Sequence, residues 1–455
     1  MSHADQTGSM SLDDGGAAGL GHDAALVLLW AENLAALPRG VALEPGTTVI
    51  GREPVGRGFR VVAPAVSRSH AAIEVGPRGC FIKDLGSRNG TRVGGVAIQH
   101  HALAHGDVVR IGDAVFVFVA HDGRRHLELD RADPARARGS SRVEGLVGGL
   151  SMDRLSQDVA GAIASGHAVL IQGETGVGKE IVARAIHEGS RRPGAFVAVN
   201  CPAIPSTLFE SELFGHVRGA FTGASRDHLG LVRAADSGTL FLDEIGDMPP
   251  DGQAKILRFL ETREVLPVGE TRPVRVDVRV VSATHRDLAA LATRGAFRGD
   301  LYARLFGYTV RVPPLRERRE DLYLLVRHAL ERSGAPRLEA TATVMERVAL
   351  YDWPFNMREL IAVVGRAASL AEGGKLKADC FPAPAPRAPA EPALAADAAP
   401  PSRRPAPKRA ELEELLVRER GNVSAVARAL ERDAALVYRW LKQHDLDPNA
   451  YRERG

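Results

Sequence analysis

Residues 169–180 read VLIQGETGVGKE, and this stretch decides the fold of the largest part of the chain. The apolar residues 169–171 are typical of a buried strand, and the apolar positions after residue 180 recur with helical spacing. Between them lies a glycine-rich loop, whose backbone N–H groups can converge on phosphate oxygens at a helix N-terminus. We therefore expect a nucleotide-phosphate site made of Gly173, Glu174, Thr175, Gly176, Val177, Gly178, Lys179 and Glu180. Taken alone, the motif is also compatible with a glycine-rich turn and an exposed lysine.

A second strand supplies the acids that phosphate chemistry needs. Residues 239–244 read TLFLDE, an apolar strand that ends in two carboxylates. We expect Asp243 to bind Mg²⁺ and Glu244 to polarise the attacking water. A helix-capping role would account for one of these carboxylates but not for both. The sequence therefore predicts an ATPase that uses ATP and Mg²⁺.

A third apolar strand, residues 278–285, ends in Thr284 and His285. If it lies next to the Asp243 strand, both side chains come near the γ-phosphate. Strands alternate with helical patterns from about residue 146 to 382, which favours an α/β domain with a parallel sheet.

The N-terminal region has a different pattern. From about residue 25 to 120, short β-branched runs alternate with glycine-rich turns, which predicts an all-β sandwich. We expect residues 1–22 to be a disordered tail, 123–145 a charged linker and 383–407 a linker rich in proline and alanine. The last segment, 408–455, has helical patterns.

Bulk composition limits the number of domains and the kinds of binding site that the chain can have. A chain of 455 residues suggests about three domains, and a net charge of only +3 restricts any DNA contact to a local surface. Three widely separated cysteines fit neither a disulfide framework nor a zinc site. Without an apolar run long enough to span a bilayer or a signal-peptide pattern, we expect a cytoplasmic protein with no membrane contact.

Residues 146–382 resemble the AAA+ domain of bacterial sigma-54 activators, the enhancer-binding proteins. The most specific motif is GAFTGA, which follows ELFGH at 212–216. The resemblance implies that this loop contacts sigma-54 through Gly219, Ala220, Phe221, Thr222, Gly223 and Ala224. It also implies that the phosphate loop ends in Lys-Glu, as it does here.

The same resemblance assigns further residues to catalysis. Asn200 is expected to hold the catalytic glutamate when the nucleotide changes. Arg298 and Arg304 are expected to reach a neighbouring subunit's ATP, although a charged helix face is an alternative reading of such a pair. Arg358, in the segment WPFNMREL at 353–360, is expected to contact nucleotide from a helical lid. The resemblance implies a homo-oligomer, from dimer to hexameric ring.

Residues 47–119 resemble a forkhead-associated (FHA) domain, which reads phosphothreonine. Residues 51–52, 67–70 and 84–91 have the order and spacing of the FHA motifs. Arg52, Ser67, Arg68 and Asn89 would donate to a phosphate dianion. His70 is expected to brace the loop. The partner would be a phosphothreonine-containing protein or a Ser/Thr kinase.

The C-terminal segment resembles a Fis-type helix-turn-helix, with Tyr438, Arg439 and Lys442 on its third helix as DNA-contacting residues. A small helical dimerisation hairpin is the alternative. Together the resemblances imply an activator that binds enhancer DNA, sigma-54 and RNA polymerase. The competing hypothesis is an FHA signalling scaffold whose ATPase remodels another protein. Because nothing like a receiver domain precedes the ATPase region, we do not expect control by aspartate phosphorylation.

Overall fold

The computed structural model describes residues 23–128 and 145–384, and near the C-terminus 409–419, 423, 425, 426, 440, 441, 444, 446 and 451. The chain divides into two compact units, Met1–Ala390 and Glu391–Gly455. Among the residues that the structure describes, every helix is too short or too polar to cross a lipid bilayer.

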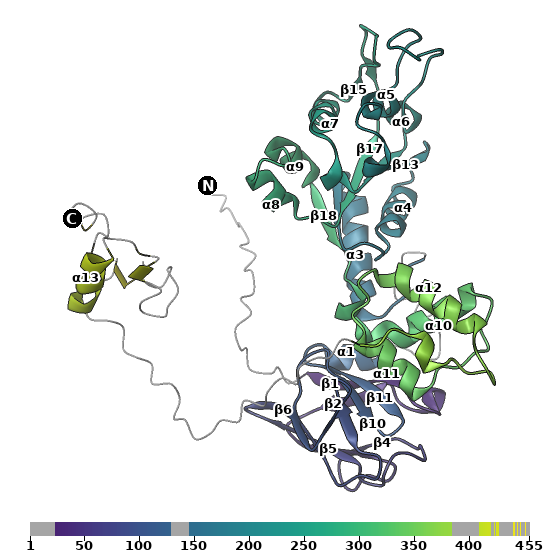
Figure 1. Ribbon diagram of the computed structural model, residues 1–455, viewed down its shortest axis with the longest axis vertical. Helices are drawn as coiled ribbons and strands as arrows, with labels where there is room; N and C mark the ends of the chain where they lie inside the picture. Colours follow the sequence, from purple (N-terminus) through teal and green to yellow (C-terminus); the bar gives the residue numbers. More distant parts are fainter. Residues whose placement is uncertain are drawn as a thin grey trace, which may run out of the picture. The chain divides into compact units, whose positions relative to one another are not determined.

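The N-terminal domain is a sandwich of two β-sheets, as predicted (Figure 1). One sheet has the strand order β2-β1-β11-β10-β7-β8 and the other β4-β3-β5-β6-β9. The strands are β1 (Ala24–Trp30), β2 (Gly40–Leu43), β3 (Gly46–Gly51), β4 (Gly58–Arg60), β5 (Ala71–Gly76), β6 (Gly79–Asp84), β7 (Thr91–Val93), β8 (Val96–Ile98), β9 (His100–Ala102), β10 (Val108–Ile111) and β11 (Ala114–Val119), with a 3-10 turn η1 (Leu34–Ala36).

The expected linker at 123–145 is corrected at its start. Residues 123–128 form helix α1 (Gly123–Glu128), which packs against β1 and β2. His126 is buried and Leu127 packs against apolar residues, and this burial stabilises the short helix.

The central domain contains a five-stranded parallel sheet in the order β13-β14-β17-β12-β18. Its strands are β12 (Val169–Gln172), β13 (Phe196–Asn200), β14 (Thr239–Asp243), β17 (Arg279–Thr284) and β18 (Tyr308–Arg311). Its helices are α3 (Leu150–Ser165), α4 (Lys179–Gly189), α5 (Phe209–Phe214), α6 (Leu231–Ala234), α7 (Pro250–Thr262), α8 (Leu288–Thr293) and α9 (Gly299–Leu305). A small antiparallel pair, β15 (Glu264–Val265) and β16 (Val274–Arg275), and 3-10 turns η2 (Cys201–Ala203) and η3 (Ile245–Asp247) complete it.

Alternate residues of each central strand face different helices, which makes three layers. Val169 and Ile171 pack with α3 and α4, whereas Leu170 packs on the side of α5, α7, α8 and α9. Both faces of the sheet are therefore buried, as expected for parallel strands. The Thr284 strand does lie next to the Asp243 strand, because β14 and β17 pair in parallel.

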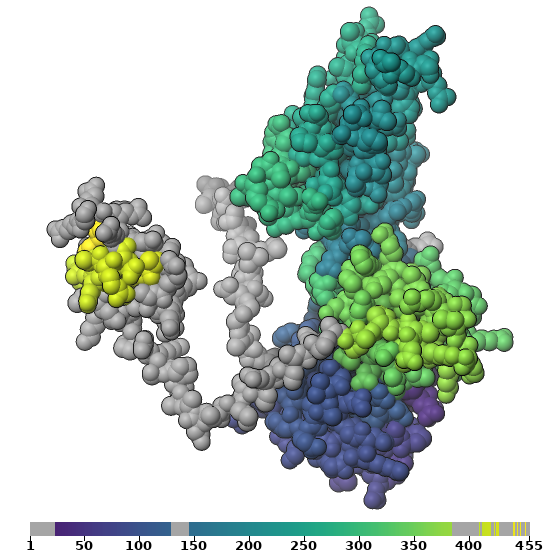
Figure 2. Space-filling view, in the orientation of Figure 1, coloured from purple at the N-terminus to yellow at the C-terminus, as the bar shows by residue number. Residues whose placement is uncertain are grey.

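A helical lid follows the central sheet. It contains α10 (Leu322–Arg332), α11 (Ala342–Leu350) and α12 (Asn356–Ser369), preceded by η4 (Leu315–Glu317) and η5 (Arg319–Asp321) and followed by η6 (Ala378–Cys380). In the space-filling view the lid, in green, touches the sandwich, in blue (Figure 2).

The C-terminal unit includes α13 (Arg409–Arg418) and a small apolar cluster around Leu412, Leu416 and Val426. The expected tail at 1–22 and proline-rich linker lie outside the described residues, apart from residues 383 and 384 at the linker's start.

Candidate active site

The predicted phosphate loop connects β12 to α4. Gly178, with φ 102°, caps α4, and Lys179 begins the helix with its side chain buried. The Lys179 ammonium donates to the carbonyl oxygens of Gly173 at 2.9 Å and Glu174 at 3.4 Å, and it forms an ion pair with Glu244 at 3.1 Å. The loop carbonyls and one carboxylate therefore hold this amine at the helix N-terminus.

The two acids at the end of β14 have opposite pKa shifts. Burial, reinforced by the neighbouring charge of Glu244, raises the pKa of Asp243. Burial also opposes ionisation of Glu244, but hydrogen bonds from His285 and Lys179 outweigh it and the pKa of Glu244 is lowered. Glu244 is thus an ionised acceptor, and Asp243 is a carboxylate whose charge lacks full compensation.

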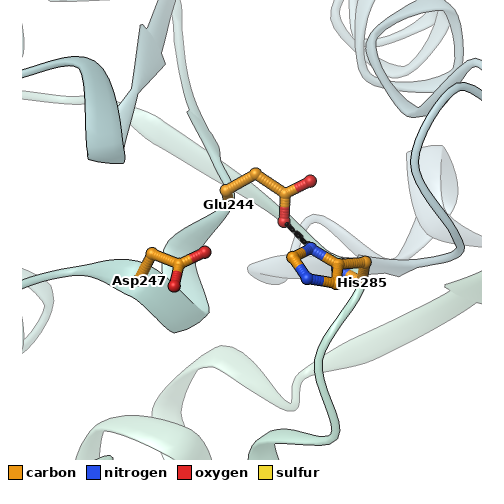
Figure 3. A group of neighbouring side chains, drawn as sticks. All are labelled: Glu244, Asp247 and His285. Carbon is orange, nitrogen blue, oxygen red and sulfur yellow. Dashed lines mark hydrogen bonds and ion pairs between the residues drawn. The ribbon is translucent and has the colours of Figure 1, made fainter.

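His285 holds the catalytic glutamate candidate from the end of β17. Its Nδ1 lies 2.6 Å from Glu244 Oε2, and its backbone N–H donates to the same oxygen at 3.2 Å (Figure 3). Asp247 lies beside this pair, and one ligand atom from each of the three residues falls within 4.8 Å of the others. Asp247 also pairs with Arg286 at 2.5 Å.

The other predicted residues of this site have separate positions. Asn200 lies opposite Asp243 in the β13–β14 pair, and within the described residues the side chains paired with Glu244 are Lys179 and His285. Thr284 is fully buried, and its carbonyl oxygen accepts from Gly173 N–H at 3.1 Å. Glu180 is exposed and pairs with Arg184 one turn along α4.

The start of lid helix α12 contacts the phosphate loop directly. Asn356, which is fully buried with φ 52°, donates through Nδ2 to the Thr175 carbonyl at 3.1 Å and to Glu174 Oε2 at 3.2 Å. The N–H of Met357 donates to the Gly176 carbonyl at 3.1 Å. The lid therefore fixes the shape of the loop.

Gly176 permits this approach. A Cβ at this position would lie 2.1 Å from the carbonyl oxygen of Phe355, so no larger residue fits. Phe355 itself has φ −106° and ψ 17°, a conformation open to ordinary residues. Arg358 is exposed, with its Cβ beside Gly176.

Sequence reasoning missed the roles of Asn356 and Arg316. Arg316 donates two hydrogen bonds to Glu174, at 2.7 and 2.5 Å, and lowers the pKa of that carboxyl. Arg316 is 142 residues from Glu174, so local patterns gave no signal for the pair. Asn356 did have a signal, since it follows Trp353 and Pro354 immediately before a helix.

The two predicted trans-acting arginines lie on the opposite face of the sheet from α4. Arg298 precedes α9 and pairs with Asp300 at 2.7 Å, and Arg304 in α9 lies 3.9 Å from Glu261. Both side chains are about half exposed. This placement leaves their guanidinium groups available at the surface.

Residues 219–224 form an exposed loop between α5 and α6. Gly219 N–H donates to the Ala224 carbonyl at 2.9 Å and closes the loop at its base. Phe221 and Thr222 are exposed, and Phe221 meets the His216 ring edge-on at 4.9 Å between centroids. Val217 and Val268 anchor the loop to the β15–β16 segment by backbone hydrogen bonds. The tip is thus accessible on a fixed base.

The predicted phosphopeptide residues lie on adjacent loops of the sandwich. Arg52 N–H donates to the Ser67 carbonyl, Ser67 Oγ accepts from Arg88 N–H, and Asn89 Nδ2 donates to the Ala65 carbonyl at 2.7 Å. The structure thus brings the loops of Arg52, Ser67, Arg68 and Asn89 together, and the two arginine side chains and Asn89 are exposed.

His70 and Asp84 brace these loops from below. His70 is fully buried; its Nδ1 accepts from Ser67 N–H at 3.1 Å, so Nε2 donates to the Gly90 carbonyl. Burial lowers the pKa of His70, in agreement with a neutral ring. Asp84 accepts from Gly86, Ser87 and Thr91. The predicted DNA-contacting residues Tyr438, Arg439 and Lys442 lie outside the described residues.

Family models match three segments of the chain: a sigma-54 interaction domain at residues 148–311, an FHA domain at 48–112 and an AAA+ ATPase lid domain at 316–396. Within the residues that the structure describes, each match falls on one of the regions described above. These matches support the fold predicted for each region.

Curated transcription regulators are similar to this chain over long stretches. The transcriptional regulatory protein GlrR of Escherichia coli K12 is 42% identical over 311 residues, covering 66% of this chain and 68% of that protein. NorR of Aeromonas salmonicida, an anaerobic nitric oxide reductase transcription regulator, is 40% identical over 335 residues, covering 69% and 66%. NtrC of Azospirillum brasilense is 49% identical over 224 residues, covering 48% of this chain and 47% of NtrC.

A solved structure of NtrX from Brucella abortus, in complex with ATP, is 32% identical and covers 71% of this chain and 74% of that one, with a TM-score of 0.49. The sequence relatives alone establish the family. The chain belongs to the sigma-54-dependent transcriptional regulators and combines an AAA+ ATPase domain and lid with an N-terminal FHA domain.

Proposed function

We propose that this protein activates transcription by sigma-54 RNA polymerase, using ATP hydrolysis in a homo-oligomeric ring to remodel the holoenzyme and permit open-complex formation. The exposed loop at 219–224 carries the proposal, because it presents an aromatic and a hydroxyl side chain from a domain that matches the sigma-54 interaction model. We further propose that residues 408–455 bind enhancer DNA and that phosphothreonine binding by the FHA domain regulates the ATPase.

The residues at the phosphate loop suit ATP hydrolysis. On ATP binding, Lys179 would exchange the Gly173 and Glu174 carbonyls for the β- and γ-phosphates. Glu244, kept ionised by His285 and Lys179, would orient and polarise the attacking water. The exposed Arg298 and Arg304 would complete the site of a neighbouring subunit.

Asp243 is a fitting ligand for Mg²⁺. Burial and the Glu244 charge disfavour its ionised form, and a divalent cation would offset that unfavourable interaction. Mg²⁺ bound there would neutralise charge that develops during phosphoryl transfer.

The test is open-complex formation by the full chain with sigma-54 holoenzyme and ATP. Thr222→Ala should leave ATP hydrolysis within about twofold of wild type and abolish open complexes, because hydrolysis and partner contact use separate surfaces. Ser225→Ala removes an exposed hydroxyl just outside the loop and should behave as wild type. Full open-complex formation by Thr222→Ala would contradict the sigma-54 contact and favour a different partner.

A further inference from the structure

The outer face of the FHA sheet is covered by the lid. Along β1, the side chains of Ala24, Leu26 and Leu28 belong to the sandwich core, whereas the alternate residues Ala25, Val27 and Leu29 belong to a second core. β11 repeats the pattern: Phe116 and Phe118 point into the sandwich, and Val115, Val117 and Val119 join the second core. Both faces of these strands are therefore buried.

The second core is shared with lid helices. It includes Leu325 and Val326 of α10 and Val344, Met345 and Val348 of α11. Helix α11 contacts β1, β10 and β11, as Figure 1 shows, and α10 and η5 contact β1. A contiguous apolar core of this kind makes the sandwich and the lid one structural body.

A charged pair fixes the register of this contact. Arg110 of β10 donates to Glu346 of α11 at 2.6 Å, with the glutamate nearly buried. The other side of the same guanidinium donates through Nε to the carbonyl of Gly112 at 2.9 Å. Removing one partner of a partly desolvated ion pair leaves the other charge without compensation and lowers the free energy of unfolding. This contact is therefore sensitive to substitution.

The Gly112 turn lies against the phosphopeptide loops. A Cβ on Gly112 would lie 2.4 Å from the Ala65 carbonyl oxygen, which is the acceptor for Asn89 Nδ2. Asn89 is a predicted phosphate donor. Direct contacts therefore connect the phosphothreonine loops, through Arg110, to α11.

At its far end α11 leads to the predicted phosphate loop. The fully buried Trp353 donates through Nε1 to the Val348 carbonyl of α11 at 2.8 Å. Three residues later Asn356 holds the carbonyl of Thr175 in the phosphate loop. A shift of α11 would thus displace the residues that shape this loop.

We propose that the FHA sandwich is an intramolecular docking partner of the lid, and that phosphothreonine binding alters nucleotide affinity through Arg110, Glu346 and the start of α12. This proposal rests on the function proposed above, because it assumes that the FHA loops bind phosphothreonine and the phosphate loop binds nucleotide. The two states that the ligands would select differ in the position of α11, and with it of the start of α12 against the phosphate loop.

The experiment measures the Kd of a fluorescent ADP for the full chain, with and without a saturating phosphothreonine peptide library. We expect the peptide to change this Kd about fivefold or more, and ADP to change the peptide Kd by the same factor, since linkage is reciprocal. The unphosphorylated library should have no effect.

Charge variants test the route. Arg110→Glu places a carboxylate beside those of Glu346 and Asp113, and it should shift the ADP Kd about fivefold even without peptide and abolish the peptide effect. The double variant with Glu346→Arg should restore wild-type values, which a misfolded protein could not do. Arg78→Glu, the same change at an exposed turn of the other sheet, is the matched control.

The outcomes are distinct. A peptide that binds without changing the ADP Kd overturns the proposal, as does an unchanged ADP Kd in Arg110→Glu. If no phosphothreonine peptide binds but Arg110→Glu shifts the ADP Kd and the double variant restores it, the lid contact is supported and the proposed phosphothreonine function fails.

Discussion

Replacing Asn356 should weaken nucleotide binding, because one buried side chain joins the lid to the phosphate loop. Its amide donates to Thr175 and Glu174, and its Oδ1 accepts from Leu315 N–H at 2.9 Å. Removing the side chain leaves the partly buried Thr175 carbonyl and the buried Leu315 N–H without these partners, at about 1–3 kcal/mol each, or roughly 2–6 kcal/mol for the contact. Nucleotide binding would then have to order the loop, and about 1.4 kcal/mol of that cost already raises the Kd tenfold.

The variants Asn356→Ala and Asn356→Gly separate two causes. Asn356 has φ 52°, which alanine adopts at a cost of about 1–2 kcal/mol and glycine adopts freely. If the hydrogen bonds matter, both variants should bind fluorescent ADP at least about tenfold more weakly than wild type. Phe355→Ala, at an exposed neighbouring side chain, should bind normally. Wild-type affinity in Asn356→Gly would refute the reasoning.

Three further predictions concern chemistry and pH. Glu244→Gln should bind ATP and lose at least about a hundredfold in turnover, because an amide is a poor base; single-turnover hydrolysis measures this. Mixing Arg298→Ala with Lys179→Ala subunits should partly restore ATPase activity if the arginine acts in trans, and no recovery at any ratio would argue against a shared site. Burial lowers the pKa of His126 to about 4, so the folded state favours the neutral ring. The contribution of neutral His126 to the free energy of unfolding is present above pH 6.5 and is lost as pH falls toward 4. The expected loss between pH 7 and pH 5 is about 2 kcal/mol. Urea unfolding of wild type and His126→Phe at both pH values checks this, and equal pH dependence would contradict it.

Local chemistry explains why much of the central domain was predictable. The phosphate loop and the acids after β14 are each contained in one short stretch, and parallel strands necessarily bring their carboxyl ends to one edge. The proximity of Thr284 and His285 to the site followed from that rule. The sequence did not reveal which side chain hydrogen-bonds to Glu244, because this contact depends on the side-chain geometry between neighbouring strands.

Long-range contacts were the least predictable. Arg110 and Glu346 are 236 residues apart, and nothing in either local pattern indicates the pair. The covered face of the sandwich did have a signal that was not used. β1 reads AALVLLW and β11 reads AVFVFV, without the polar alternation of a strand that has one face in water.

The shared core also has a practical consequence for handling the protein. A fragment that ended at residue 122 would place the outward valines of β11, together with Val27 and Leu29, in water. Contiguous apolar surface of this kind promotes self-association. Solubility and specificity measured on such a fragment would report the exposed face as well as the loops, and a chimera that transplants this sandwich would need the matching lid helices.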